Sequence, residues 1–184
     1  MKTFLSIVLA TALCAPAFAQ KGGMSASAPT IKQSIMAGAA KISLDYTAIP
    51  WVRGENMAKI LDKANGADAR KGLNNRAPKD PLASFSTSVD VTCGDLQIPA
   101  GDYQVFFTIT EELVWNINFQ GKDKLLTTKL NVSNDDKHES KRLLLCLYAG
   151  EESGAGVYVA FGKQSGMINF TPGAAKAADA KAGK

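Results

Sequence analysis

The sequence predicts an all-β fold, an antiparallel β-sandwich or jelly-roll-like domain of about eight to nine strands with one short helix. Apolar and polar residues alternate with a period of two through most of the chain. Turn-forming residues interrupt this alternation at intervals typical of sandwiches and barrels. Only one segment, residues 55–64, has apolar side chains at helical spacing. The chain has 184 residues, 46% of them hydrophobic, which suits a single domain with one core.

Residues 1–19 have the three parts of a secretory signal peptide. Lys2 supplies the positive charge, and residues 4–15 form an apolar run too short to span a bilayer. The small residues at either end of 17–19 (Ala-Phe-Ala) predict cleavage before Gln20. We therefore expect a periplasmic or secreted protein. No later apolar run approaches the ~20 residues of a membrane helix, so no membrane span is expected.

Two segments flank the expected domain. Residues 20–29 are predicted to be a flexible leader and residues 173–184 a disordered Ala/Lys tail, because neither has an apolar face to bury. The β-sandwich domain is therefore expected over residues 30–172.

The longest alternation runs over residues 85–93. Turns are expected after it at residues 94–95 and 99–102, where Gly, Asp and Pro gather. Because strands joined by tight turns usually pair with each other, we expect these segments to form an antiparallel meander. The other predicted strands are 42–46, 103–109, 115–119, 126–132, 141–149, 156–162 and 166–171.

Residues 105–107 and 143–148 are apolar on both strand faces, so each predicts a strand that needs cover on both sides. Residues 55–64 place Met57, Ile60 and Leu61 on one face of a helix. We expect this helix to cover part of one sheet.

The formal net charge of +4 lies mostly outside the expected domain. The tail contributes Lys176, Lys181 and Lys184 against Asp179, whereas residues 22–172 are neutral. Nucleic-acid-binding domains concentrate positive charge on a folded face, so no nucleic acid partner is expected.

Residues 53–79 depart from this balance, with seven basic and three acidic side chains. Such a run is either a solvated face or an anion site. Trp51 directly follows Pro50 and lies two residues before Arg53, a combination that suits a sugar face or an anion. The alternative is that Trp51 closes one end of the core. The candidate ligand-binding residues are Trp51, Arg53 and Arg76, for a small-molecule, glycan or protein ligand.

The sequence contains few of the residue patterns that are typical of catalytic sites. Its single histidine, His138, lies in a polar turn without companions for a zinc site or a Ser-His-Asp triad. It has no phosphate-binding glycine loop and no dinucleotide motif. We therefore expect no catalytic residues, no metal and no cofactor, and interpret the protein as a non-catalytic binding or envelope-associated module. One alternative is an exported hydrolase-like enzyme with Asp45, Asp80 and Asp90 in one cleft. A second is a structural subunit that oligomerises through flat apolar strands.

Two cysteines remain after the signal segment, Cys93 and Cys146. In an exporting compartment they could form one disulfide. Both lie in apolar strand contexts, so a pair of buried free thiols is the alternative.

Several segments occur in a recognisable order: a strand with Pro and Arg-Gly over residues 43–54, then Leu-Gln-Ile-Pro-Ala-Gly-Asp-Tyr over 96–103, then two closing strands over 157–170. This order resembles a bacterial domain-of-unknown-function family, numbered 2911. The resemblance covers residues 30–171 and implies an exported, mostly β domain without an established activity. Residues 76–83 keep the family's Arg but lack its Asn-Glu pair.

Overall fold

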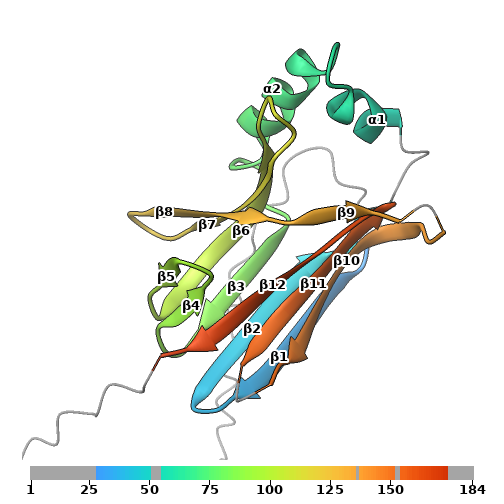
Figure 1. The fold of residues 1–184 in the computed structure, drawn as a ribbon. Coiled ribbons are helices and arrows are strands. Elements are labelled where there is room, and N and C mark those ends of the chain that lie inside the picture. Colours follow the sequence, from blue (N-terminus) through green and yellow to red (C-terminus); the bar gives the residue numbers. More distant parts are fainter. Residues whose placement is uncertain (1–27, 51–54, 136, 152–153, 174–184) are drawn as a thin grey trace, which may run out of the picture.

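The computed structural model describes residues 28–50, 55–135, 137–151 and 154–173. Within these residues, twelve strands form two antiparallel sheets that pack face to face, which confirms the predicted all-β sandwich (Figure 1). The described part contains two short helices where one was predicted. In chain order the elements are β1 (Thr30–Ala37), β2 (Ala40–Thr47), α1 (Glu55–Leu61), α2 (Ala67–Arg76), β3 (Ala83–Thr87), β4 (Val91–Cys93), β5 (Leu96–Ile98), β6 (Gly101–Ile109), β7 (Trp115–Gln120), β8 (Leu125–Leu130), β9 (Val132–Asn134), β10 (Ser140–Ala149), β11 (Ala155–Gly162) and β12 (Gln164–Pro172).

The two sheets differ in the order of their strands. Sheet 1 has the strand order β1-β2-β3-β6-β7-β8, and sheet 2 has the order β10-β11-β12-β4-β5 with β9 paired to β12. In both sheets the side chains alternate between the core and the outer face, as the period of two predicts.

The expected strand over residues 85–93 is two strands in different sheets. β3 pairs with β2 and β6 in sheet 1, whereas β4 pairs with β12 and β5 in sheet 2. The chain bends between them, and the Thr87 hydroxyl donates to the carbonyl oxygen of Val89 at 2.7 Å. The prediction of one continuous meander is therefore wrong at this corner, where the chain changes sheets as strands do at sandwich corners.

One edge of the sandwich is closed by a strand that crosses between the sheets. β8 pairs with β7 in sheet 1, and β9 pairs with β12 in sheet 2, with only Asn131 between them. Gly166 of β12 lies against this crossing. A Cβ atom on Gly166 would be 2.7 Å from the Asn131 carbonyl oxygen and 3.2 Å from a methyl carbon of Leu130. The crossing therefore requires glycine at position 166.

The opposite edge is closed by a side chain. The amide of Gln33 in β1 donates from Nε2 to the Leu145 carbonyl oxygen at 2.5 Å, and its Oε1 accepts the Leu147 backbone N–H at 2.9 Å. Beyond β2, Pro50 forms an isolated bridge with Arg142 of β10. The two sheets are thus held together along both edges as well as through the core.

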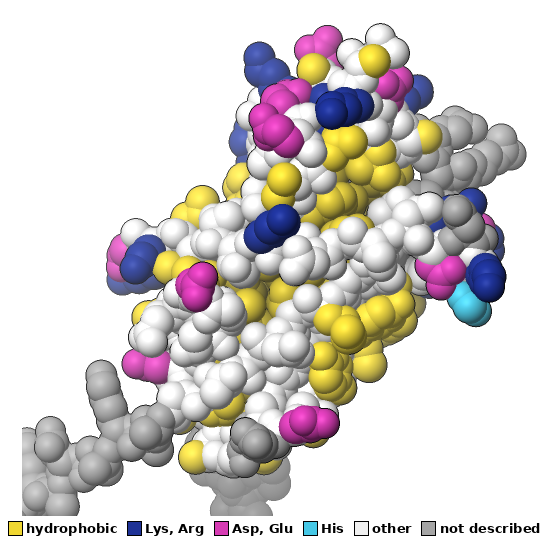
Figure 2. All heavy atoms as spheres, in the orientation of Figure 1, with side chains coloured by type: hydrophobic (Ala, Val, Ile, Leu, Met, Phe, Trp, Pro, Cys, Tyr) yellow, Lys and Arg dark blue, Asp and Glu magenta, His cyan; other side chains and the backbone are white. Residues whose placement is uncertain are grey.

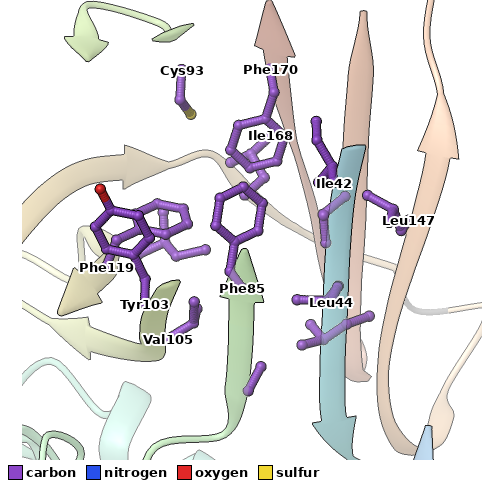
Figure 3. Close-up of a cluster of buried hydrophobic side chains, with 14 of the residues drawn as sticks. Ile42, Leu44, Phe85, Cys93, Tyr103, Val105, Phe119, Leu147, Ile168 and Phe170 are labelled. Carbon is purple, nitrogen blue, oxygen red and sulfur yellow. The ribbon is translucent and has the colours of Figure 1, made fainter. Parts of the chain in front are cut away.

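The core contains a cluster of aromatic rings between the sheets (Figure 3). The ring of Phe85 from sheet 1 stacks on Phe170 from sheet 2, with centroids 5.1 Å apart, and meets Phe119 edge-on at 5.4 Å. Tyr103 completes the cluster and donates its hydroxyl to the Pro99 carbonyl oxygen at 2.7 Å. Contacts of this kind contribute beyond the area that the rings bury.

The prediction of a helix within residues 55–64 is confirmed, since α1 forms there, but the sheet is contacted mainly by the second helix. α1 packs on α2, and α2 packs against β6 at one end of the sandwich (Figure 1). The Asn74 side chain accepts the Ile109 backbone N–H at 3.0 Å and donates to the Ile109 carbonyl oxygen at 2.9 Å. Neither helix in the described residues is long and apolar enough to cross a membrane.

Arg70 joins the helix pair to the sandwich. Its side chain is only 2% exposed, and its Nη1 donates to the carbonyl oxygens of Ile60 and Asp62 at the end of α1. Its Nη2 forms an ion pair with Glu111, in the turn after β6, at 2.9 Å. This member of the basic run 53–79 is therefore buried rather than part of a solvated face.

The two strands predicted to be buried on both faces behave differently. In β6, Phe106 is buried although it points away from the core residues Val105 and Phe107. In β10, Leu144 and Cys146 are exposed between buried neighbours. The prediction is confirmed for β6 and wrong for β10, whose outer face has no cover among the described residues.

Candidate functional site

A depression of about 520 Å³ lies on the outer face of sheet 1. We call it the polar depression, because most of the side chains that line it carry hydroxyl, amide, carboxylate or ammonium groups. Its lining residues are Ser43, Asp45, Ser84, Phe85, Ser86, Asp102, Tyr103, Gln104, Gln120, Gly121 and Lys122.

The strand register gathers these side chains from four neighbouring strands. One row across the sheet runs Asp45, Ser84, Gln104 and Gln120, from β2, β3, β6 and β7 respectively. A second row, two residues away along the strands, runs Ser43, Ser86 and Asp102. Because neighbouring strands lie about 4.8 Å apart, the first row presents polar groups at regular intervals over about 14 Å.

Some of these groups bond to one another and others remain available. The Asp45 carboxylate forms an ion pair with Lys32 at 3.6 Å, and Gln104 Nε2 donates weakly to the Ser84 hydroxyl at 3.5 Å. Within the described part of the chain, the side chains of Asp102 and Ser86 form no hydrogen bond with another residue. These two neighbouring side chains are therefore the free acceptor and the free hydroxyl at the centre of the second row.

The lining of the depression includes two residues of the core. Phe85 and Tyr103 belong to the aromatic core cluster, and a Cβ atom on Gly121 would be 3.2 Å from the Tyr103 ring. Burial, and secondarily the charge of Asp90, raises the pKa of the Tyr103 hydroxyl. Tyr103 thus serves as a neutral hydrogen-bond donor within the fold rather than as an acid or base.

The arrangement is suited to binding hydroxyl groups. Serine hydroxyls and glutamine amides can donate and accept, while carboxylates accept. Asp45 and Asp102 are separated by about 12 Å between Cα atoms, estimated from the strand spacing and the rise per residue. No group of three His, Cys, Asp or Glu side chains in the described residues is arranged to hold a metal ion.

The sequence-predicted ligand residues do not form this site. Trp51 and Arg53 lie outside the described residues. Arg76 is the last residue of α2 and forms an ion pair with Asp80 at 2.9 Å. Arg76 does not line the polar depression.

The three acids named for the enzyme alternative have separate partners. Asp45 pairs with Lys32, Asp80 pairs with Arg76, and the carboxylate of Asp90 accepts the backbone N–H of Ala100 at 2.9 Å. Each carboxylate therefore has a local structural partner, and of the three only Asp45 lines the depression.

His138 lies in an exposed turn, as predicted, where its Nδ1 is 2.8 Å from the Asp135 carboxylate. The same carboxylate accepts the backbone N–H of Lys137 at 2.8 Å. These hydrogen bonds, that of Lys137 first, lower the pKa of Asp135. The contacts organise the turn locally.

Both remaining cysteines are free thiols in the structure. Cys93 is buried in β4 and Cys146 is exposed in β10, with two strands of sheet 2 between them. The three strand spacings alone amount to about 14 Å, whereas a disulfide needs Cα atoms within about 7 Å. The alternative of a disulfide between them is therefore wrong for this fold, and the expectation that both thiols are buried holds for Cys93 alone.

The polar depression was missed because its residues carry no motif. Ser84, Ser86, Asp102 and Gln104 each occupy the solvent side of an alternating strand, which is the ordinary place for a polar residue. The only sequence signal was the alternation itself. Their convergence depends on the pairing of β3 with β6, which skips the β4–β5 hairpin.

Comparison with protein-family models, with curated proteins and with solved structures found no match. The resemblance to family 2911 therefore stays a prediction.

Proposed function

We propose that the protein is an exported, non-catalytic binding module whose polar depression binds an uncharged, hydroxyl-rich ligand such as a glycan. The observation that carries this proposal is the convergence of hydroxyl, amide and carboxylate side chains from four neighbouring strands on one depression. Export rests on the signal-like segment at the start of the sequence.

The composition of the depression favours a neutral ligand. Its two carboxylates, Asp45 and Asp102, are accompanied by Lys32 at the rim and Lys122 in the lining. The charges are thus balanced, so neither an anion nor a cation gains a large electrostatic advantage. Carboxylates and amides that alternate with hydroxyls can instead accept from and donate to the hydroxyl groups of a sugar.

The support is a sheet rather than a loop, which limits the entropy lost when a ligand binds. Ser86 and Asp102 face each other across β3 and β6, and both strands are anchored by core residues on their other side. A ligand that lies across the strands would meet polar groups at regular intervals without reordering the protein.

The test is a binding titration with the purified protein against a panel of neutral, acidic and basic oligosaccharides. We expect a neutral member of the panel to bind, and expect Ser86→Ala and Asp102→Ala each to weaken it by about fivefold to tenfold, the effect of one hydrogen bond. Ser133→Ala is the matched control, because Ser133 is an exposed serine on a strand of sheet 2. Unchanged affinity in both depression variants would show that the ligand binds elsewhere.

A further inference from the structure

The outer face of sheet 2 has a different character from that of sheet 1. Nine outward positions on β10, β11 and β12 form three rows across the sheet, and none of the nine residues carries a charge. We call these positions the apolar face. Its rows are Leu144–Ala160–Ser165, Cys146–Tyr158–Met167 and Tyr148–Gly156–Asn169.

Large apolar side chains on this face are open to solvent. Met167 is 59% exposed and Leu144 is 40% exposed, and Cys146 between them is exposed as well. Figure 2 shows hydrophobic side chains gathered on this side of the molecule, beside the strands of sheet 2. Contiguous exposed apolar surface of this kind marks interaction sites more often than free surface.

The apolar face is also flattened by an internal contact. Gly156 leaves room for the ring of Tyr148, because a Cβ atom on Gly156 would lie 2.3 Å from the ring carbon that bears the hydroxyl. The Tyr148 ring therefore lies across β11, and its hydroxyl donates to the Asn169 side-chain oxygen at 2.7 Å. A ring fixed in this way offers its outer side to a partner at little cost in entropy.

Charged residues stand at the two ends of the apolar face, and their signs differ. Lys141, Arg142 and Lys163 lie at the end where Ser140 pairs with Gly162. Glu151 lies in the turn at the opposite end, after β10. Lys141 also contacts Glu139, and Arg142 donates from Nη1 to the Ala48 carbonyl oxygen at 3.0 Å, so the excess of positive charge at the first end is modest. An uncharged centre with a charged rim is the usual anatomy of a protein interface.

We propose that the apolar face binds the same face of a second copy of this chain, with the strands of the two copies antiparallel. A twofold axis along the middle row brings the basic end of one copy to the acidic end of the other. A parallel arrangement would instead oppose the basic ends. The charge pattern therefore selects the antiparallel dimer, an isologous contact of the kind most homodimers use.

The position of the twofold axis determines which residues of the two copies meet. Because the axis follows the middle row, Cys146, Tyr158 and Met167 each meet their own counterparts. Three strands of about ten residues cover a plane of roughly 450 Å², below the ~800 Å² per partner of a standard interface. We therefore expect a weak dimer that forms and dissociates with concentration.

The first experiment is sedimentation of the full mature protein over a wide concentration series, with two charge substitutions compared. Met167→Lys places two like charges together at the proposed axis and should give a monomer at every concentration. Met36→Lys is the matched control, because Met36 is a 63% exposed methionine in β1, on sheet 1. A monomeric native protein, or equal dimerisation of the native protein and Met167→Lys, would overturn the proposal.

The second experiment uses the natural thiol on the middle row. A short bismaleimide should link Cys146 to the partner's Cys146 in concentrated native protein, and the link should be lost in Met167→Lys but kept in Met36→Lys. Cys93 should not contribute, because it is buried. Dimers that dissociate with concentration but never cross-link through Cys146 would contradict the proposed axis. Either result is independent of glycan binding, which is measured on the other sheet.

Discussion

Replacing Gln33 by leucine should cost the protein about 2 kcal/mol of unfolding free energy. Gln33 is half-buried, and its amide occupies the place that a neighbouring strand would take beside β10. It satisfies one carbonyl, that of Leu145, and one N–H, that of Leu147. Leucine keeps the size of the side chain but can bond to neither group, so both backbone groups lose their partner at the junction of the two sheets.

The magnitude follows from those two bonds. Each hydrogen bond of this kind contributes about 1 kcal/mol net, and a buried group left without a partner costs about 1–3 kcal/mol. Because the edge is only partly buried, water can hydrogen-bond to some of the backbone groups that lose Gln33. The expected loss of unfolding free energy therefore lies near the lower end of this range. Gln33→Glu should be no better: its carboxylate can still accept from Leu147 but opposes the Leu145 carbonyl oxygen.

Urea unfolding gives the free energies, and hydrogen exchange of the Leu147 amide reports on the edge directly. The control is Gln104→Leu, since Gln104 bonds only weakly, at 3.5 Å, on the outer face of sheet 1. We expect the control to change stability by less than about 0.5 kcal/mol. If Gln33→Leu changes the unfolding free energy as little as the control does, and the Leu147 amide exchanges as slowly as before, the Gln33 side chain is not what joins the sheets at this edge.

Three further predictions concern stability. Gly166→Ala should destabilise the protein by about 1–3 kcal/mol, because the added methyl group meets the strand crossing, whereas Gly72→Ala in α2 has open space and should gain up to about 1 kcal/mol in urea unfolding. Arg70→Lys should lose about 3 kcal/mol and helical circular dichroism, because an ammonium group cannot reach both carbonyls and the carboxylate together. Burial raises the pKa of Cys93 to about 11 from 9.0, so unfolding free energy should fall as pH rises from 9 toward 11, where the unfolded thiol ionises first. Cys93→Ala should reduce that slope and leave only the part that comes from Tyr103, whose pKa burial also raises; an unchanged slope would assign it to another group.

The fold class could be predicted because it depends on local pattern. Residues 103–109 and 115–119 alternate strictly enough to assign both face and strand, and β6 and β7 form there. The order of strands in the sheets could not be predicted. It depends on the bend at residues 88–90, where a nine-residue alternation gives no sign that its two ends enter different sheets.

The candidate site illustrates the same limit at the level of side chains. Ser86 and Asp102 are sixteen residues apart with a whole hairpin between them, yet they are cross-strand neighbours. Each is an ordinary polar residue on the solvent side of a strand. Only the register of β3 with β6 shows that the two are neighbours. The positive run 53–79 was the more conspicuous signal, but its Arg70 is buried and its Arg76 is paired with Asp80.

The error over residues 143–148 has a physical meaning. A strand that is apolar on both faces predicts cover on both faces, and β10 lacks cover over Leu144 and Cys146 in the described structure. The apolar pattern of the sequence and the exposure in the structure disagree at this strand. Such disagreements are most often found at functional surfaces. A second copy of the chain would supply the missing cover, in which case the sequence pattern describes the dimer correctly.

The two proposals have a joint consequence that neither has alone. The polar depression and the apolar face lie on opposite outer faces of the sandwich, so a dimer through sheet 2 presents its two depressions in opposite directions. Such a dimer cannot place both depressions on one straight ligand chain, and avidity on a single chain is therefore not expected. It can instead bridge two chains. Met167→Lys should then abolish the cross-linking of a long neutral polysaccharide, measured as turbidity or viscosity, while leaving the affinity for a short oligosaccharide unchanged; a parallel loss of both would mean that the two faces are coupled through the core.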